Sequence, residues 1–391
     1  MLKRLEIQNL FDEYSYVIDW KQSAFKDLLY ITAPNGMGKT TILKMIAGLA
    51  TFTPYEYMHY PFGHVRFIFD GGEMIDLTRT VTPIHTDSMT DELPEVETKL
   101  ECEYTVKKTD FSKKERYTWT FRKDKLVASD GDDLTNMMML LQTDKCRFFP
   151  DDRVFKELES SYDKQSIGTE NIKSYLIDLQ VRLENTFVYK PDSIDVNEWN
   201  EEDWQKRKAK VLRIVDFLRT CDINIGGEEP YQNLQKLVGA DLIFLIKRYE
   251  NAIRENKESI DRLITYRTVM DRFKFIGTEL KLSPRYGYRL VKEKTGDFLQ
   301  FYQLASGERH LLCLMNGLFF IQTESQLVLI DEPEMSYHMY WQIQFCRTIK
   351  EIVKKLHLRA LMATHSPQMF DDDFSLTVDL WEQWDKQRRG K

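Results

Sequence analysis

A segment near the N-terminus combines residue types that bind phosphate groups. Residues 33–41 contain two glycines, a lysine and two threonines, and they follow an apolar run at 28–31. Small residues let successive backbone N–H groups turn inward around a phosphate, and the start of a following helix adds partial positive charge. The ligands expected here are Asn35, Gly36, Gly38, Lys39, Thr40 and Thr41. Lys39 would contact the phosphates of a nucleotide, and the Thr40 hydroxyl would hold Mg²⁺.

One position of this loop departs from the usual pattern, because Ala33 stands where the first glycine is expected. Alanine is small, so we expect the loop to survive the change. The alternative is a glycine-rich turn that carries a lysine by coincidence. The strand expected before the loop and the helix expected after it disfavour that alternative.

Two adjacent carboxylates follow a second apolar run. Residues 327–330 are all apolar and predict a buried strand, after which come Asp331 and Glu332. Ligands of open α/β sheets bind at this end of the strands. Asp331 would contact Mg²⁺ through water, and Glu332 would act as general base on an attacking water. The alternative, a strand that ends in solvated acids, is disfavoured by the phosphate-binding loop.

Two further segments could contact a phosphate. His365 follows a strand expected at 360–364, where its ring could sense a γ-phosphate, although a lone histidine is more often structural. Residues 303–309 lead into a helix, and the candidates there are Ser306, Gly307 and Glu308. Ser306 and Gly307 could present a hydroxyl and backbone N–H groups to a phosphate. An ordinary helix N-cap at Ser306 is the alternative.

The elements that must position these residues alternate between strands and helices at both ends of the chain. Near the N-terminus we expect strands at 5–7, 16–18, 28–31, 64–69, 100–106 and 116–121 and a helix at 40–49. Toward the C-terminus we expect strands at 286–291, 326–330 and 360–364, helices at 307–322 and 339–356, and a short tail. The pattern predicts an α/β fold, with a mixed central sheet and an antiparallel β layer.

Between these ends the hydrophobic period becomes helical. The longest stripe runs over 239–275, and charged residues fill its other positions, as in a helical arm or short coiled coil. A projecting helical arm and a helical subdomain packed on the α/β domain are equally compatible with this pattern. The expected division is an N-terminal lobe at 1–165, a helical insertion at 166–276 and a C-terminal lobe at 277–391.

The composition is that of an ordinary globular protein, since 42% of the 391 residues are hydrophobic and 30% are charged. The formal net charge of -7 argues against a dedicated DNA-coating protein but allows a local basic groove. Five scattered cysteines without a Cys-x-x-Cys pair argue against a disulfide framework and a zinc site. Without a signal peptide or a run of about 20 apolar residues, a cytoplasmic protein with no membrane contact is expected.

The order of the four motifs resembles the ABC ATPase superfamily. A phosphate-binding loop (Walker A), a signature loop, a strand ending in two acids (Walker B) and a switch histidine follow one another in that order. The resemblance implies ATP and Mg²⁺ as cofactors. The roles that it implies are phosphate and Mg²⁺ binding by Lys39 and Thr40, Mg²⁺ binding by Asp331, general-base catalysis by Glu332 and a switch function for His365.

The resemblance also implies that Ser306 and Gly307 act on ATP held by a partner subunit. A composite site of this kind requires at least a dimer. The glutamine that links Mg²⁺ to the lid in this superfamily corresponds either to Gln142 or to a position in the segment 147–153.

Details of the motifs look like the OLD/RecF-like branch of the superfamily, which is related to the SMC and Rad50 heads. These details are the signature at 305–309, the Walker B continuation at 331–338 and the switch loop at 364–368. OLD-type nucleases carry a Toprim nuclease domain after the switch loop. Because only residues 368–391 follow here, we expect no cleavage of nucleic acid by this chain alone.

Within this branch, residues 5–11 and the motifs look most like the AriA family, the ATPases of PARIS anti-phage systems. That resemblance implies a homo-oligomer beyond a dimer, such as a hexamer, which holds a separate Toprim effector nuclease of AriB type inactive. A phage trigger protein would then cause ATP-dependent release. Two alternatives stay open, namely a DNA-repair ATPase of RecF or Rad50 type and a Septu-like ATPase paired with an HNH nuclease. The basic segment 206–210 would suit nucleic acid, but a solvated helix face explains it more simply.

Overall fold

The computed structural model describes residues 1–51, 54–84, 96–108, 111–122, 125–132, 137, 140–141, 146–149, 166–188, 200–320 and 327–390. The chain divides into two compact units. The first consists of Met1–Phe155 together with Thr323–Lys391, and the second of Lys156–Gln322. The phosphate-binding loop, Asp331, Glu332 and His365 therefore belong to the first unit, whereas residues 306–308 belong to the second.

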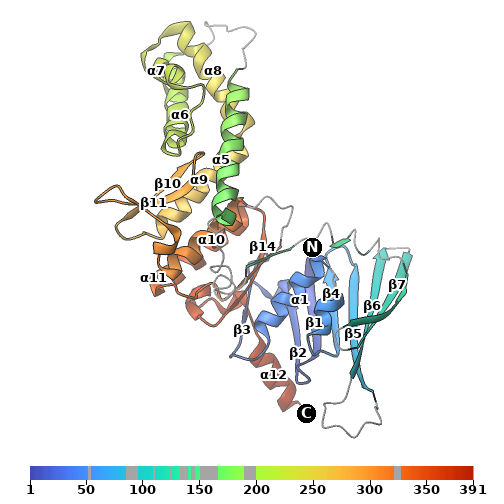
Figure 1. Cartoon of the computed structure of the whole chain (residues 1–391). Coiled ribbons are helices and arrows are strands. Elements are labelled where there is room, and N and C mark those ends of the chain that lie inside the picture. The colour runs from blue at the N-terminus through green and yellow to red at the C-terminus, as the bar shows by residue number, and fades with distance from the viewer. Residues whose placement is uncertain are drawn as a thin grey trace. The chain divides into compact units, whose positions relative to one another are not determined.

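The first unit contains a five-stranded parallel sheet in the order β15-β3-β14-β13-β9. Figure 1 labels two of its strands, β3 and β14. Its strands are β3 (Leu28–Thr32), β9 (Cys146–Phe149), β13 (Leu327–Asp331), β14 (Arg359–Thr364) and β15 (Thr377–Asp379). The central strands are almost continuously apolar and buried, as parallel strands covered on both faces must be. Because β3, β13 and β14 are parallel neighbours, the residues that follow them meet at one edge of the sheet.

A seven-stranded antiparallel sheet has the order β2-β1-β4-β5-β6-β7-β8. Its strands are β1 (Leu2–Leu10), β2 (Tyr14–Asp19), β4 (His64–Phe69), β5 (Met74–Pro83), β6 (Val96–Lys108), β7 (Phe111–Arg122) and β8 (Lys125–Gly131). Strand β4 alternates between half-buried and buried residues, which is the pattern that predicted it. Strand β8 is additional to the expected strands, and its residues are all exposed, so no alternation marks it in the sequence.

Helix α1 (Lys39–Thr51) shares one hydrophobic core with residues of both sheets. Its buried side chains include Ile42, Leu43 and Ile46, and the core also contains Leu29 from β3 and Phe67 from β4. Helix α2 (Pro54–Met58) follows in the chain. The predicted α/β class is confirmed, with an antiparallel β layer beside the central sheet. The five strands of the central sheet are all parallel, rather than mixed as expected.

The chain after His365 contributes more than the short tail that we expected. After β14, two short 3-10 helices lead into β15 and then α12 (Leu380–Arg389). Helix α11 (Met339–Lys355) lies before β14. The side-chain amide of Gln383 in α12 both accepts from and donates to the backbone of Val17, at 2.8 Å each. Helix α12 is thereby bonded to β2, the edge strand of the antiparallel sheet.

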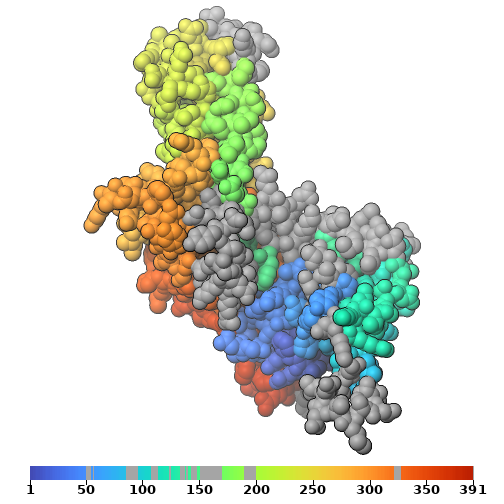
Figure 2. Space-filling model, in the orientation of Figure 1, coloured from blue at the N-terminus to red at the C-terminus, as the bar shows by residue number. Residues whose placement is uncertain are grey.

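The second unit is mainly helical. It consists of α5 (Ser166–Phe187), α6 (Glu201–Thr220), α7 (Glu228–Lys236), α8 (Gly239–Glu255), α9 (Lys257–Arg272), the strands β10 (Thr278–Ser283), β11 (Gly287–Lys292) and β12 (Phe298–Leu299), and α10 (Ser306–Phe320). Figure 2 shows α6 to α8, in yellow, closely packed beside α5, in green. Among the described residues, none of the helices combines the length and apolarity required to span a bilayer.

The single helical stripe expected at 239–275 is interrupted at Asn256, which separates α8 from α9. Asn256 has φ -111° and ψ 17°, outside the helical region. Its buried side-chain amide donates to the carbonyl of Ala252 at 2.9 Å and to Oγ1 of Thr186 at 3.1 Å. The side chain thus competes with the helical backbone for its partners, which explains the break.

The second unit also extends beyond residue 276, where we expected the helical insertion to end. It includes the three-stranded sheet β10-β11-β12 and α10, and it ends at Gln322. Aromatic packing accounts for the difference. The ring of Phe320 in α10 lies 4.9 Å from that of Tyr175 in α5 and 4.7 Å from that of Tyr266 in α9. The helix after the signature loop therefore belongs to the same compact unit as the insertion.

Candidate functional site

The phosphate-binding loop joins β3 to α1, and α1 begins at Lys39. Gly36 and Gly38 have φ values of +84° and +86°, a region that favours glycine. A Cβ atom at Gly38 would lie only 2.7 Å from Cδ2 of Leu10, so β1 packs directly against the loop. The hydroxyl of Tyr16 donates to the carbonyl of Met37 at 3.1 Å. Residues of the antiparallel sheet thus contact the loop directly and stabilise its conformation.

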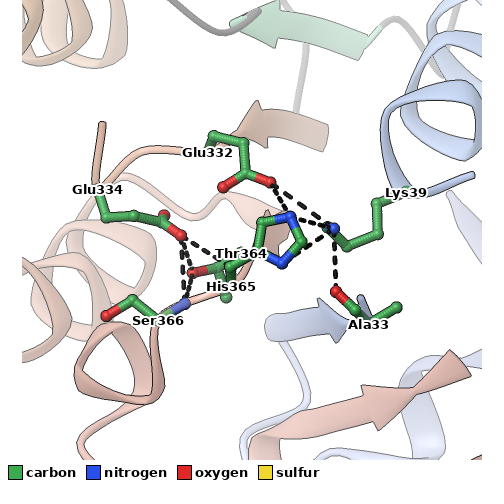
Figure 3. A network of polar contacts seen from close by, with 7 residues as sticks. All are labelled: Ala33, Lys39, Glu332, Glu334, Thr364, His365 and Ser366. Carbon is green, nitrogen blue, oxygen red and sulfur yellow. Dashed lines mark hydrogen bonds and ion pairs between the residues drawn. The ribbon is translucent and has the colours of Figure 1, made fainter. Parts of the chain in front are cut away.

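Three side chains from three separate segments converge beside this loop (Figure 3). Nζ of Lys39 lies 2.6 Å from Nε2 of His365 and 3.7 Å from Oε1 of Glu332, and it donates to the carbonyl of Ala33 at 3.1 Å. Nε2 of His365 lies 3.0 Å from Oε1 of Glu332. Lys39 is 6% exposed, and Glu332 is 17% exposed. The structure therefore brings together the lysine, acid and histidine that the sequence analysis identified separately.

Burial governs the ionisation of these three groups. It lowers the pKa of Lys39, and the neighbouring carboxylates of Glu332, Asp331 and Glu334 act in the opposite direction. It raises the pKa of Glu332 to about 8, with Glu334 as the next cause. It also lowers the pKa of His365, as does the charge of Lys39. The imidazole is therefore neutral at pH 7 and can accept a hydrogen bond from the Lys39 ammonium group.

The backbone around Glu332 is unusual. Its φ is +47°, a left-handed conformation that a non-glycine residue rarely adopts, and its N–H donates to the carbonyl of Ala363 at 2.9 Å. Left-handed backbone at a non-glycine residue often accompanies functional sites, where the surrounding structure enforces it. Here the hydrogen bond from Glu332, the residue after β13, to Ala363 in β14 holds that backbone in place.

The residues assigned to Mg²⁺ fit that ion by their chemistry. Asp331 is the last residue of β13 and is 1% exposed, and its negative charge acts to raise the pKa of Lys39. Thr40 is the second residue of α1. A hydroxyl and a carboxylate are hard oxygen donors, and Mg²⁺ is usually held by one or two such protein groups together with substrate phosphates. Asn35 and Thr41 lie in the same loop and first helical turn.

Glu334 is a residue of this site to which the sequence analysis gave no role. Its Oε1 accepts hydrogen bonds from Oγ1 of Thr364 at 2.6 Å, from the backbone N–H of His365 at 2.8 Å and from that of Ser366 at 3.3 Å. The only sequence signal is a third acid two positions after Glu332. That spacing does not reveal a contact with residues some thirty positions later.

The end of the chain also contributes. An open pocket of about 410 Å³ lies beside the phosphate-binding loop, and it is lined by Thr32, Ala33, Pro34, Thr364, His365, Asp379 and Trp381. The carboxylate of Asp379 accepts from the backbone N–H groups of Trp381 and Glu382, and so caps α12. Because only a short tail was expected after the switch loop, the sequence analysis did not predict that Asp379 and Trp381 line this pocket.

The signature loop lies in the second unit, at the start of α10. Ser306 is exposed, and Gly307 is buried. The carboxylate of Glu308 accepts from the backbone N–H of Ala305 at 2.9 Å, which is the reciprocal half of a capping box. A role for these residues on a partner's nucleotide stays a prediction. Gln142 and residues 150–153, considered for the Mg²⁺-to-lid glutamine, lie outside the described residues, and 146–149 form β9.

Residues 193–371 match the model of a protein family described as "AAA domain, putative AbiEii toxin, Type IV TA system". The match covers less than half of the 391 residues and includes the signature loop, Asp331, Glu332 and His365. This segment is therefore similar to an AAA-type ATPase domain. No curated protein sequence gives a significant match.

Solved SMC head domains are similar to the chain at low sequence identity. The Smc head of Pyrococcus furiosus, with an extended coiled coil and bound to the C-terminal domain of ScpA, is 13% identical with a TM-score of 0.41, covering 94% of this chain and 90% of that one. The SMC head domain of Thermotoga maritima is 12% identical with a TM-score of 0.35, covering 95% and 91%.

Proposed function

We propose that this chain binds and hydrolyses ATP with Mg²⁺ at the site formed by Lys39, Glu332 and His365. The observation that carries the proposal is the convergence of these three side chains within 4 Å of one another, beside a glycine-containing loop that leads into helix α1. The surrounding residues suit a nucleoside triphosphate with Mg²⁺, because the loop offers backbone N–H groups and the negative charge of Asp331 acts on Lys39.

Each residue has a role that follows from its chemistry. Lys39 and the loop N–H groups would bind the phosphates, and in doing so Lys39 would exchange the carbonyl of Ala33 and the ring of His365 for phosphate oxygens. Glu332, when ionised, would accept a proton from the attacking water. His365, as a neutral imidazole, would donate a ring N–H to a phosphate oxygen. When bound, Mg²⁺ neutralises charge on the phosphates.

The proposed active unit contains at least two copies of the chain. The N–H groups at the start of α10 and the exposed Ser306 offer a second phosphate-binding surface. In the ABC arrangement this surface, with Gly307 and Glu308, would act on ATP held by the other subunit. A homo-oligomer beyond a dimer, such as a hexamer, is part of the same proposal.

The biological role that we propose is that of a cytoplasmic sensor and scaffold in bacterial anti-phage defence. The oligomer would hold a separate Toprim-type nuclease effector inactive and release it in an ATP-dependent step on contact with a phage trigger protein. Support comes from the motif resemblance to the AriA family. The description of the matching family names the AAA domain itself as a putative toxin of a toxin–antitoxin system, and it says nothing of a separate effector.

The test combines the mass in solution with the rate of ATP hydrolysis, with and without double-stranded DNA, for the wild type and for Glu332→Gln. Glu101→Gln, an exposed carboxyl on β6, is the control. We expect a large assembly without nucleotide, hydrolysis indifferent to DNA, and a loss of rate of about 10²- to 10⁴-fold in Glu332→Gln only. A monomer that dimerises only with ATP and is strongly stimulated by DNA would instead identify a repair ATPase. Absence of hydrolysis by the wild type would refute the enzymatic proposal.

A further inference from the structure

The carboxylate of Glu334 is bonded to the segment that carries His365, at three consecutive residues. Its Oε1 atom accepts from the Thr364 hydroxyl, from the His365 N–H and from the Ser366 N–H. The Thr364 hydroxyl in turn accepts from the Ser366 N–H at 3.0 Å. One oxygen atom thus fixes the backbone on both sides of His365, as Figure 3 shows.

A second connection joins the same two segments from the other side. The hydroxyl of Ser366 donates to Oε1 of Gln342 at 2.6 Å, and Nε2 of Gln342 donates to the carbonyl of Tyr337 at 3.1 Å. Tyr337 closes the turn that follows Glu332, since its N–H donates to the carbonyl of Glu334 at 2.9 Å. The switch segment 364–366 and the turn 332–337 are therefore linked at both ends.

The spacing between Glu332 and Glu334 is stiff. The residue between them is Pro333, whose ring fixes its φ near -65°. The backbone of Glu332 is itself held by its bond to Ala363. A displacement of Glu334 relative to Glu332 would have to distort this short segment. The hydrogen bonds of Glu334 therefore connect the short segment that begins at Glu332 to the segment that carries His365.

We propose that Glu334 is a positioning residue, which fixes His365 relative to Glu332 for the hydrolysis of ATP. This inference rests on the proposed function. In this role Glu334 acts through the hydrogen bonds that it accepts from the Thr364 hydroxyl and from the backbone N–H groups of His365 and Ser366, and not through its contact with the Glu332 carboxyl. The competing explanation is that only its negative charge matters. A third explanation is that it merely stabilises the fold.

Two conservative variants separate these explanations. Glutamine keeps an oxygen acceptor at the same reach but removes the charge, whereas aspartate keeps the charge but withdraws the acceptor by one methylene group. If position matters, Glu334→Gln remains close to the wild type, and Glu334→Asp is impaired. If only charge matters, the order is reversed.

The experiment measures kcat and KM for ATP hydrolysis by the full chain, at a fixed alkaline pH, together with the midpoint of thermal unfolding. We expect Glu334→Gln within about threefold of the wild type, and kcat of Glu334→Asp and Glu334→Ala lowered about 10- to 100-fold with KM nearly unchanged, because misplacement by about 1 Å has costs of that order. Glu103→Ala is the control, since Glu103 on β6 is also bonded to two partners, Lys114 and Arg116. It is expected to keep the wild-type kcat.

The outcomes divide clearly. Wild-type kcat in Glu334→Asp, or impairment of Glu334→Gln alone, would overturn the inference. So would a loss of kcat that only follows a lower unfolding midpoint. If an aspartate or alanine variant fails to fold, Thr364→Val replaces it, because it removes one of the three donors at a residue that is fully buried. Its kcat is expected to fall, and an unchanged kcat would contradict the inference. A wild type without hydrolysis would refute the proposed function rather than this step.

Discussion

Nζ of Lys39 lies 2.6 Å from Nε2 of His365, although 326 positions separate the two residues in the chain. Both atoms are nitrogens, so one must donate and the other accept. Because burial and the charge of Lys39 lower the pKa of His365, the imidazole is the neutral acceptor. The proposed phosphate-binding lysine is therefore hydrogen-bonded to the proposed switch histidine. In the proposed function, a phosphate oxygen would replace that contact.

Lys39→Ala is expected to weaken ATP binding by about 10- to 100-fold, since a hydrogen bond to a charged group contributes about 1.5–3 kcal/mol. Lys44→Ala is the matched control, because Lys44 is an exposed lysine of the same helix α1. Equilibrium titration with a fluorescent ATP analogue measures both variants. Equal affinities would remove Lys39 from the phosphate site.

The stability of the ligand-free chain is expected to depend on pH through Glu332. Its pKa is raised from 4.5 to about 8, mainly by burial and then by Glu334. Between these values the folded chain keeps a proton that the unfolded chain releases, so the stabilisation present below pH 4.5 is lost as the pH rises toward about 8. Glu332→Gln lacks this group. The free energy of unfolding of Glu332→Gln should therefore increase relative to that of the wild type as the pH rises.

Chemical denaturation without nucleotide at about pH 5, 7 and 9 measures this difference. The gap between Glu332→Gln and the wild type should widen from pH 5 to 7 and then level off above about 8. Glu101→Gln, at an exposed site on β6, controls for the loss of a charge. A gap that is constant at all three values would show that Glu332 has an ordinary pKa in the folded chain.

The two glycines of the phosphate-binding loop are expected to differ in their tolerance of alanine. Both have positive φ, which costs a non-glycine residue about 1–2 kcal/mol. A Cβ at Gly36 meets nothing within 4 Å, whereas one at Gly38 meets Leu10 at 2.7 Å and Phe11 at 3.2 Å. Gly38→Ala should therefore lower the free energy of unfolding more than Gly36→Ala does. Denaturant titration of both variants tests the order, and the reverse order would contradict the packing of β1 on the loop.

Gln383→Ala is expected to lower the free energy of unfolding by about 1–3 kcal/mol, because it removes two hydrogen bonds to the backbone of Val17. Lys386→Ala on the same helix is the control. Lys386 makes an exposed ion pair with Glu382, which contributes little. Comparison of their unfolding midpoints in denaturant is the measurement. A midpoint for Gln383→Ala equal to that of the control would show that α12 docks without this amide.

The sequence determined those features that one short segment specifies by itself. The apolar runs of β3, β13 and β14 predict buried strands, and ligands of open α/β sheets bind at the carboxyl ends of such strands. That rule favours one common site for the phosphate-binding loop, Glu332 and His365, whereas the contacts among their side chains come from the structure. The glycines at 36 and 38 predict a loop with positive φ, because glycine has no Cβ atom and adopts such values readily.

Tertiary structure alone decided the contacts that no single segment encodes. The three bonds accepted by Glu334, the addition of β15 to the sheet and the docking of α12 depend on which segments become neighbours. Strand β15 has only three residues, too few to show a period. The break at Asn256 and the inclusion of α10 in the second unit follow from side-chain packing with distant residues. Periodicity reports which face of an element is buried, but it does not report the partner against which that face packs.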